Sequence, residues 1–444
     1  MRRRTARWTV ALVAAALACT GAAPAAATST PAPGSPVTSF GGGDGVILAP
    51  IPAMVADRDL DGVAVEAIDA VVGGPGAGSF RLYMSANWLD AALLIVKQYR
   101  SDGSVDMAWN AGRARVLRWL QPDDKYFPIV VDGRHRAYVA VGGFESTVTV
   151  RRLLPSGNWD PDYEVRTGGG DFQHPSALAV ARDGSIRYCQ SPFAAHDPRI
   201  AVEEFDSAGS PLRASVIDVS GIADSAVCFG AAVAPDGSSL LRVALYQADG
   251  AMREAILKVQ PGGGLDGSFG VDGVAVLPAG FRADGGPYAT IGTPLFTVGR
   301  RIVATGQSAA AGRDRPTLVV LTESGDPDAG FGYGGTLRLA HAQAFVRHAA
   351  TDLQGGMFVS LQSLGSSGER PDPGLLHLNA SGRPVTAFGA GGFLRFSPGT
   401  GARATGPAAV AVFASGKLLV GVCALRATTY AGVIPAARVD KRWA

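Results

Sequence analysis

A glycine-rich segment recurs along this chain, and its spacing constrains the fold more than any other feature. Its clearest copy, GGLDGSFGVDGV at 263–274, follows the pattern G-x-x-D-x-x-F-G-x-x-G, and we call this pattern the marker. Copies of graded quality begin at Gly34, Gly103, Gly157, Gly209, Gly263, Gly325 and Gly382. This regular return predicts seven repeats of ~58 residues, an arrangement typical of repeat architectures.

The aromatic position of the marker is the second periodic feature. It holds a ring in six copies, whereas the weakest copy has Ser215 there; the rings are Phe40, Trp109, Tyr163, Phe269, Phe331 and Phe388. A single ligand site does not need six equivalent rings. The periodicity therefore predicts that the rings are packing wedges between neighbouring repeats rather than stacking platforms for a ligand.

Each repeat also contains short apolar runs separated by tight-turn sequences. FPIVVDGRHRAYVAVGG at 127–143 reads as strand, Asp-Gly turn and strand; TVTVRRLL at 147–154 supplies a third strand, and the segment after the marker a fourth. No helical period is sustained. Four-stranded units repeated around an axis form a β-propeller, so the sequence predicts an all-β, seven-bladed β-propeller.

The two ends of the chain are expected to close the ring. VIPAARVD at 433–440 resembles the apolar stretches that precede the other markers, but the chain stops where its marker should come. The marker at Gly34 has no such stretch before it. We therefore expect the C-terminal strand to complete the blade that the N-terminal marker begins.

The first 27 residues have the layout of a secretory signal peptide. Four arginines precede an apolar run at 8–18, and small residues end at Ala27. The run is too short for a permanent membrane helix, which needs roughly 20 residues, and no later run reaches that length. A lipid anchor at Cys19 is the alternative to simple secretion. Residues 28–36 form a Pro-rich linker, and 37–444 form one propeller domain.

The charge balance excludes one class of partner. The leader contains four of the 40 Lys and Arg residues and none of the 38 acids, so the mature chain is nearly neutral. No basic run or stripe remains, and the electrostatic footprint of a nucleic-acid-binding protein is therefore absent. We expect a monomer whose partner is a cell-envelope or extracellular ligand of unknown identity.

The marker resembles the delta-60 repeat of secreted and surface-associated bacterial proteins. The segments GGLDGSFGVDG at 263–273 and GDPDAGFGYGG at 325–335 carry the resemblance, which extends with declining quality from Gly34 to the C-terminus. It implies export and a propeller-like architecture, and it transfers no catalytic residue.

An Asp-rich segment is the candidate metal site. Asp57, Asp59 and Asp61, followed by Gly62, give the D-x-D-x-D-G arrangement of calcium-binding loops. The twelfth position of an EF-hand loop is Ile68 rather than Glu, although Glu66 is close enough in sequence to substitute. The competing interpretation is a solvated Asp-rich turn without calcium.

Three cysteines remain after processing, and two of them are candidates for a disulfide. Cys189 and Cys228 are 39 residues apart in adjacent repeats, and an oxidising compartment would allow them to pair. The alternative is that all three are buried thiols. Cys423 lies in an apolar run and is expected in a core strand.

No sequence motif identifies a reaction. The six histidines are scattered, without metal-ligand spacing to cysteines or acids, and there is no G-x-S-x-G, H-E-x-x-H or phosphate-binding loop. The sequence thus predicts a binding or surface-interaction module, with catalytic residues unknown. The alternative is a propeller hydrolase or lyase, similar to lactonases, that acts at the channel mouth, and it depends on analogy of fold alone.

Overall fold

The fold was examined in a computed structural model, which describes most of the chain from Ala64 to Pro435. The described ranges are 64–72, 79–88, 91–100, 102–119, 129–132, 134–141, 148–167, 172–192, 197–283, 295–310, 313–340, 344–352, 354–363, 374–395, 402–412, 418–426 and 433–435. These ranges contain strands throughout and one short 3-10 turn, η1 (Asn110–Gly112). The all-β class predicted from the sequence is confirmed.

The strands form successive antiparallel sheets, and each sheet uses a continuous stretch of chain. Sheet A has β1 (Ala64–Val72), β2 (Ser79–Trp88), β3 (Ala91–Arg100) and β4 (Arg115–Trp119); sheet B has β5 (Ile129–Val131), β6 (Ala137–Val141), β7 (Val148–Leu153) and β8 (Trp159–Thr167). Sheet C has β9 (Phe172–Val180), β10 (Ile186–Pro192), β11 (Arg199–Phe205) and β12 (Pro211–Asp218).

The second half of the chain continues the series. Sheet D has β13 (Ser225–Val233), β14 (Ser239–Tyr246), β15 (Met252–Val259) and β16 (Val274–Val276); sheet E has β17 (Phe281–Arg282), β18 (Leu295–Val298), β19 (Arg301–Ala310), β20 (Arg313–Leu321) and β21 (Thr336–Arg338). Sheet F has β22 (Ala344–Thr351), β23 (Met357–Ser363), β24 (Gly374–Leu378) and β25 (Phe393–Arg395); sheet G has β26 (Ala402–Val412), β27 (Leu418–Arg426) and β28 (Val433–Pro435).

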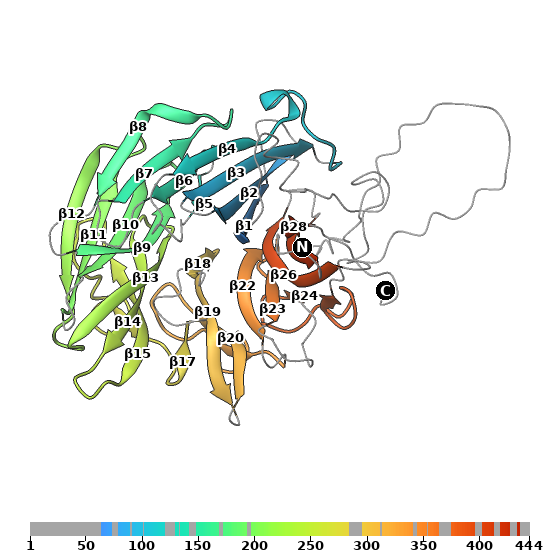
Figure 1. Ribbon diagram of the computed structural model, residues 1–444. Helices are drawn as coiled ribbons and strands as arrows, with labels where there is room; N and C mark the ends of the chain where they lie inside the picture. Colours follow the sequence, from blue (N-terminus) through green and yellow to red (C-terminus); the bar gives the residue numbers. More distant parts are fainter. Residues whose placement is uncertain are drawn as a thin grey trace, which may run out of the picture.

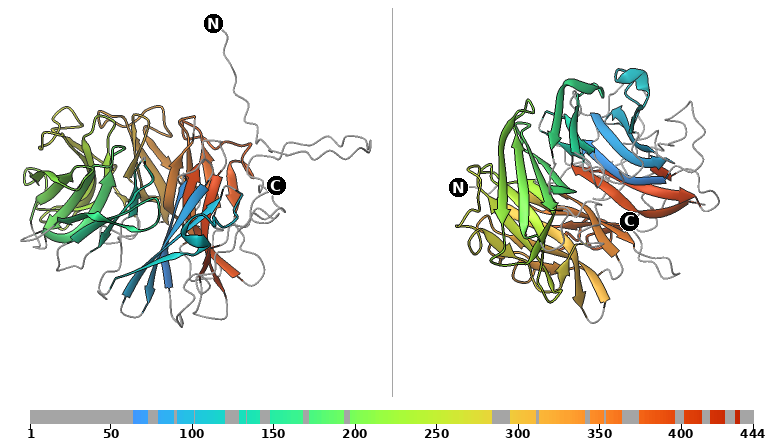
Figure 2. Two further views of the ribbon diagram at one scale, coloured as in Figure 1. Left: turned by 90° about the horizontal axis from the view of Figure 1, so that it is seen from above. Right: turned by 60° about the vertical axis from the view of Figure 1, so that its left-hand side comes forward.

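The sheets are arranged radially around one axis, as Figure 1 and the two turned views in Figure 2 show. The first strands of neighbouring sheets lie beside each other, for example β5 with β9, β9 with β13 and β22 with β26. β1 also contacts β26 and β27, so the first described sheet lies against the last. Antiparallel sheets placed in this way, each with its first strand near the axis, make the molecule a β-propeller.

The number of blades differs from the sequence prediction. Six sheets have four or five strands, whereas sheet G has three among the described residues, so the structure has six complete blades rather than seven. The reason is the position of the outermost strand. In the complete blades this strand lies within the marker or directly after it, whereas β28 pairs with β27 alone among the described strands, and the marker at Gly34 lies outside the described residues.

The strand order within each blade agrees with the sequence prediction. In sheet B, β5 and β6 flank the Asp-Gly turn, β7 is the third strand, and the outermost strand β8 begins within the marker, at Trp159. A β-bulge also interrupts the first strand of five sheets, at β1, β9, β13, β22 and β26. Bulges in these inner strands increase the local twist that a strand needs near the crowded axis.

The marker is a compact turn whose residue types follow from its backbone. Gly263 and Gly273 have φ angles of 77° and 90°, a region that side chains disfavour. Between them, the Asp266 carboxylate accepts a hydrogen bond from the Ser268 N–H at 3.1 Å, and the Asp266 carbonyl accepts one from the Phe269 N–H at 2.8 Å. The same two bonds recur around Asp106 and Asp328, so the marker Asp has a structural role in this turn.

The marker rings are wedges between blades, as the sequence predicted. All five rings within the described residues are buried: Trp109, Tyr163, Phe269, Phe331 and Phe388. Each of the first four packs against the first glycine of the next marker; a Cβ added at Gly325 would lie 3.0 Å from Phe269 Cε2. An inter-blade hydrogen bond from Gly270 N–H to the Ser324 carbonyl, at 2.7 Å, supports this contact. The sixth ring, Phe40, lies outside the described residues.

The hydrophobic core lies between neighbouring sheets. One apolar cluster joins residues of sheets C and D, such as Val202 and Val243. Another joins sheets D and E through Ile256, Phe269 and Val319. Neighbouring sheets therefore bury apolar side chains against each other in these clusters, and marker rings such as Phe269 contribute to the same contacts.

Candidate functional site

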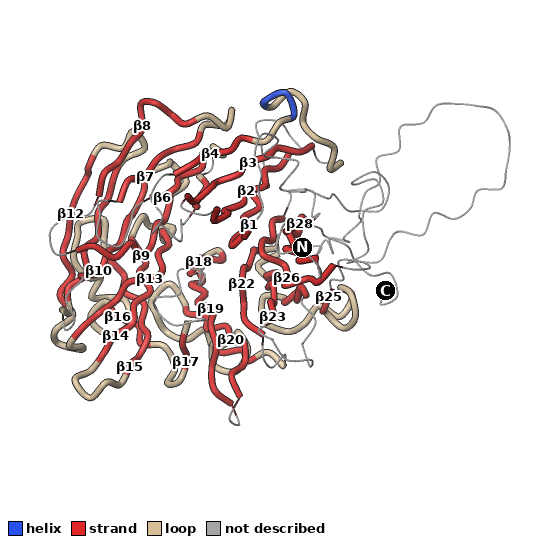
Figure 3. Tube along the Cα trace, in the orientation of Figure 1, coloured by secondary structure: helices blue, strands red, loops and turns tan. Residues whose placement is uncertain are grey.

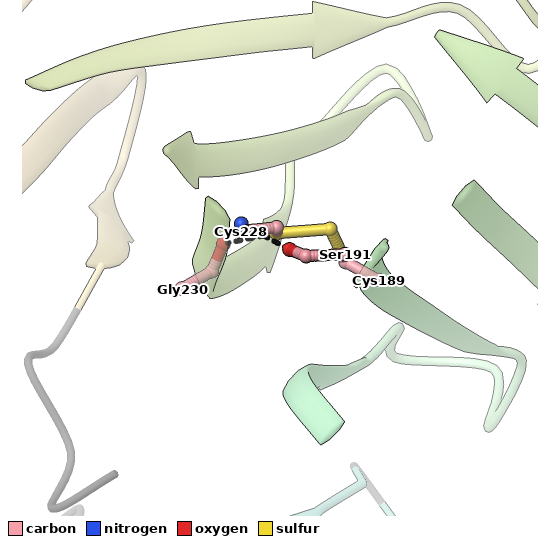
Figure 4. Close-up of a disulfide and its surroundings, with 4 residues drawn as sticks. All are labelled: Cys189, Ser191, Cys228 and Gly230. Atoms are coloured by element: carbon pink, nitrogen blue, oxygen red, sulfur yellow. Dashed lines mark hydrogen bonds between the residues drawn. A yellow bond between two sulfur atoms is a disulfide. The ribbon is translucent and has the colours of Figure 1, made fainter. Parts of the chain in front are cut away.

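The predicted disulfide is present and joins two blades. Cys189 on β10 and Cys228 on β13 are bonded, with 6.3 Å between their Cα atoms (Figure 4). The Cys228 N–H also donates to Ser191 Oγ at 2.7 Å, and both cysteines are fully buried. The bond therefore has a structural position between sheets C and D. Cys423 lies on strand β27, and its place in the core stays a prediction.

The candidate calcium residues cannot be placed. Asp57, Asp59 and Asp61 lie outside the described residues, so the calcium loop stays a prediction. Among the residues that the structure describes, no group of three or more His, Cys, Asp or Glu side chains has the geometry to hold a metal ion.

Histidine and acid side chains meet at one buried position. His377 Nε2 lies 3.0 Å from Asp352 Oδ2, and the imidazole stacks on Phe358 with 4.0 Å between the ring centres. The ring of Phe388 packs edge-on against the same imidazole. Asp352 also accepts backbone hydrogen bonds from Gln354 and Gly356. Since every contact is internal to sheet F and its turns, the pair orders a hairpin.

Charged pairs inside the blades have the same structural character. Arg242 and Glu254 form a fully buried ion pair at 2.6 Å, and Arg242 also donates to the Thr305 carbonyl in the next sheet at 2.5 Å. Arg152 pairs with the marker residue Asp160 at 2.6 Å. Each arginine forms an ion pair within its own blade and donates a hydrogen bond to a backbone carbonyl of the next blade. These groups therefore connect the blades and are not candidate catalytic groups.

A groove on the outer edge of the propeller is the strongest candidate for a functional site. It has a volume of about 710 Å³ and lies over β16, between the turn that follows β12 and the marker turn that precedes β21. β12 and β16 are labelled in Figure 3. Ligand pockets typically have volumes of roughly 300–1,000 Å³, so the groove is large enough for a ligand or a short peptide segment.

Apolar side chains line most of the groove. Val271 and Val276 are 76% and 54% exposed, and Ile222 is 43% exposed. These three residues come from the marker turn of sheet D, its outermost strand and the turn after β12. Contiguous exposed apolar surface in a groove is typical of interaction sites. The arrangement can bind a partner by excluding water from these side chains.

The polar part of the lining is acidic. Three exposed carboxylates, Asp218, Asp272 and Asp326, line the groove, and its described lining includes no Lys or Arg. The pKa of Asp218 is lowered, chiefly because its carboxylate accepts a hydrogen bond from the Ser220 N–H. It is therefore ionised at neutral pH, and the groove has a negative rim around an apolar floor.

The sequence analysis did not identify this groove. Its residues come from three separate stretches of chain, near 218–222, 265–278 and 319–336, and only the radial packing of sheets C, D and E brings them together. One signal was available. Val271 and Tyr333 occupy equivalent variable positions of two markers, and an apolar residue at a turn tip, where a polar residue is expected, indicates exposed apolar surface.

Comparisons with known proteins give no family for this chain. No protein-family profile matches the chain, and no curated protein matches it. Solved structures similar to it include cobalt-substituted Synechocystis ACO, with 11% identity, coverage of 82% of this chain and 86% of that chain, and a TM-score of 0.44. The BP39L lectin of Burkholderia pseudomallei has 11% identity, covers 71% and 82%, and has a TM-score of 0.42.

A third similar structure is the polysaccharide lyase Uly1. It has 9% identity, covers 84% of this chain and 90% of the lyase chain, and has a TM-score of 0.41. At such low identity and TM-score, none of these likenesses assigns an activity or a ligand. In the part of the chain that the structure describes, no helix has the length and apolar character needed to span a bilayer.

Proposed function

We propose that this protein is an exported β-propeller that acts as a binding or surface-interaction module, with the groove over β16 as its binding surface. The observation that carries the proposal is the exposure of Val271 and Val276 on the wall of a cavity of about 710 Å³. Apolar side chains that remain exposed to water add no stability to the fold. Exposed valines in a concave surface are accounted for when a partner covers them.

Two features support export. The N-terminal 27 residues have the layout of a signal peptide, and a disulfide such as Cys189–Cys228 is typical of oxidising compartments. The resemblance of the marker to the delta-60 repeat of secreted bacterial proteins is in agreement with both. The ligand would then be a component of the cell envelope or the extracellular medium.

The test uses two valines in equivalent settings. Val276 on β16 and Val216 on β12 both lie on outermost strands and are 54% and 57% exposed, but only Val276 lines the groove. The purified mature protein is screened by thermal shift against cell-envelope glycans and peptides. A ligand of the groove should stabilise the parent and V216K and lose its effect on V276K. A ligand that stabilises all three proteins equally would place binding elsewhere.

The alternative function, a propeller hydrolase or lyase at the channel mouth, has no specific observation in its favour among the described residues. It makes a different prediction from the binding module. Turnover of a lactone or an acidic polysaccharide by the purified protein, unaffected by V276K, would favour the enzyme.

We also propose that the N-terminal segment supplies the outermost strand of sheet G. Among the described strands, none pairs with β28 on the side away from β27, and the contact of β1 with β26 and β27 brings the first and last described sheets together. Ending the chain at Gly432 removes β28 and exposes the edge of β27. The melting temperature should then fall sharply, whereas an unchanged value would contradict the closure.

A further inference from the structure

We infer that the partner of this groove is an extended peptide segment in which Lys or Arg alternates with aliphatic residues. This inference rests on the proposed function and adds the chemistry of the ligand. Three independent properties of the groove lead to it: its apolar floor, its acidic rim and the outward-facing backbone groups of Val276 on β16.

The apolar floor selects aliphatic side chains. Val271, Val276 and Ile222 present branched aliphatic surface, and deeper positions are occupied by buried residues such as Val274 and Val319. No aromatic residue is among the described residues that line the groove, so it lacks the stacking platforms that sugar rings and bases use. Covering apolar surface yields roughly 25 cal/mol per Å².

The acidic rim selects a cationic partner. Asp218 at the end of β12 and Asp272 and Asp326 in two marker turns stand around one groove whose described lining holds no cation. The Asp326 carboxylate accepts a hydrogen bond from Ser324 Oγ at 2.9 Å, and Asp218 accepts one from the Ser220 N–H. Neither hydrogen bond neutralises charge, and Arg199, which lies opposite Asp218 on β11, forms its ion pair with Asp197 at 2.6 Å. A partner with positive charges at the edges of an aliphatic segment complements this surface.

The backbone of β16 selects an extended conformation. β16 is the outermost strand of sheet D, and the Leu277 N–H donates to the Glu254 carbonyl of β15 at 2.8 Å. Backbone groups alternate in direction along an antiparallel strand, so those of Val274 and Val276 point away from β15. The Val274 groups are already bonded to Val271 of the marker turn, whereas those of Val276 face the groove side of the strand. An extended segment can pair with the Val276 backbone while its alternate side chains enter the groove, as in β-strand addition.

These properties define one mode of binding. Residues that alternate along an extended segment point to opposite sides, so aliphatic residues can contact Val276 and Val271 while basic residues reach the carboxylates at the rim. Binding should weaken in high salt because the carboxylates are exposed. Binding should also require both the aliphatic and the basic residues of the segment. The apolar floor complements only the aliphatic residues, and the acidic rim complements only the basic ones.

The experiment measures fluorescence anisotropy of three labelled eight-residue peptides with the mature protein. One peptide alternates Lys and Val, the second alternates Glu and Val, and the third alternates Lys and Ser. We expect binding of the Lys-Val peptide, at least tenfold weaker binding of the Lys-Ser peptide and no binding of the Glu-Val peptide. Equal binding of the Lys-Val and Glu-Val peptides, or of the Lys-Val and Lys-Ser peptides, would overturn the inference.

Variants of the protein locate the bound peptide. V276K should abolish binding of the Lys-Val peptide, and the double variant D272N/D326N should weaken it about tenfold, whereas V216K should bind like the parent. Asp272 and Asp326 are exposed, so both changes leave the core intact, and melting curves check this. Unchanged affinity of V276K would overturn the inference.

One outcome separates this inference from the function on which it rests. If no Lys-Val peptide binds, but a glycan or another ligand from the screen stabilises the parent and not V276K, the groove is a binding site and the peptide assignment is wrong. If nothing depends on V276K, the proposed function fails together with the inference.

Discussion

Two blade interfaces of this propeller close the same gap by different means. Between sheets D and E, the ring of Phe269 fills the space against Gly325, and the Gly270 N–H donates to the Ser324 carbonyl at 2.7 Å. Between sheets C and D, the equivalent position is Ser215. Its Oγ would lie 2.6 Å from a Cβ added at Gly263, so a small side chain faces the glycine there.

The interface without an aromatic wedge is the one that the disulfide crosses. Cys189 belongs to sheet C and Cys228 to sheet D, so the covalent bond joins two sheets whose marker contact has Ser215 in place of a ring. The comparison indicates that both blade interfaces have a specific stabilising contact in addition to general apolar packing. A buried ring gives it through dispersion and exclusion of water, and a disulfide gives it by restricting the unfolded chain.

The largest expected effect is loss of a wedge. F269A and F331A each remove a fully buried ring and leave a cavity against the next marker glycine. Each change should lower the free energy of unfolding by about 3–5 kcal/mol. Chemical denaturation measures the loss. If both variants unfold like the parent but lose a ligand, the rings form a binding surface and the wedge interpretation is wrong.

The second effect concerns the disulfide. The double variant C189S/C228S should lose about 2–4 kcal/mol, because the bond closes a loop with a sequence separation of 39 residues. Hydrogen exchange should increase first at β12 and β13, on the two sides of the unfastened interface. Increased exchange that begins instead in sheets E and F would contradict the comparison.

The third effect is a pH dependence of the marker turn. Hydrogen bonds from Ser268, followed by that from Lys258, lower the pKa of Asp266. A lowered folded-state pKa gives stability that is present above the unfolded pKa of about 3.9 and is lost as the pH falls through the folded value. D266N should therefore cost about 1.5–3 kcal/mol at neutral pH.

Acid titration of the unfolding free energy provides the check on this prediction. Below about pH 4 the parent should lose stability toward that of D266N, and the difference between the two proteins should shrink. D272N is a matched control, because Asp272 is exposed at the tip of the same marker. A difference between parent and D266N that stays constant on acidification would exclude this carboxylate as the source.

The smallest expected effect sharpens the comparison from the other side. S215A changes the marker position that already lacks a ring, so its stability should remain within about 0.5 kcal/mol of the parent. A loss of stability comparable to that of F269A would mean that Ser215 itself stabilises the interface between sheets C and D. The disulfide would then not be the substitute for the missing ring. The same denaturation series measures both variants.

The repeat allowed much of the scaffold to be predicted. Gly157, Gly263 and Gly325 all have φ angles between 77° and 86°, and this local requirement makes the marker visible in sequence. The strand order of a blade also followed from local turn signals. The number of complete blades did not, because the outermost strand of sheet G depends on which distant segment pairs with it.

The partner of each marker Asp could be predicted only in part. Asp160 and Asp266 pair with Arg152 and Lys258, which occupy the same position in the strand before each marker. In sheet E that position is Val320, and Asp328 pairs with Arg301 at 2.6 Å instead. Sequence spacing finds a partner within one strand and turn, whereas a partner from another strand of the sheet becomes visible only in three dimensions.

The sequence by itself determined the fold class, the phase of the strands and the buried character of the marker rings, because each depends on local backbone conformation and on period. Tertiary structure alone decided which glycine each ring meets, that Cys189 and Cys228 are bonded rather than free thiols, and where the groove lies. These depend on the radial stacking of sheets, which places Ile222, Val276 and Asp326 around one cavity although the chain separates them widely. Stacking is a contact between distant segments, and no local signal in the chain encodes it.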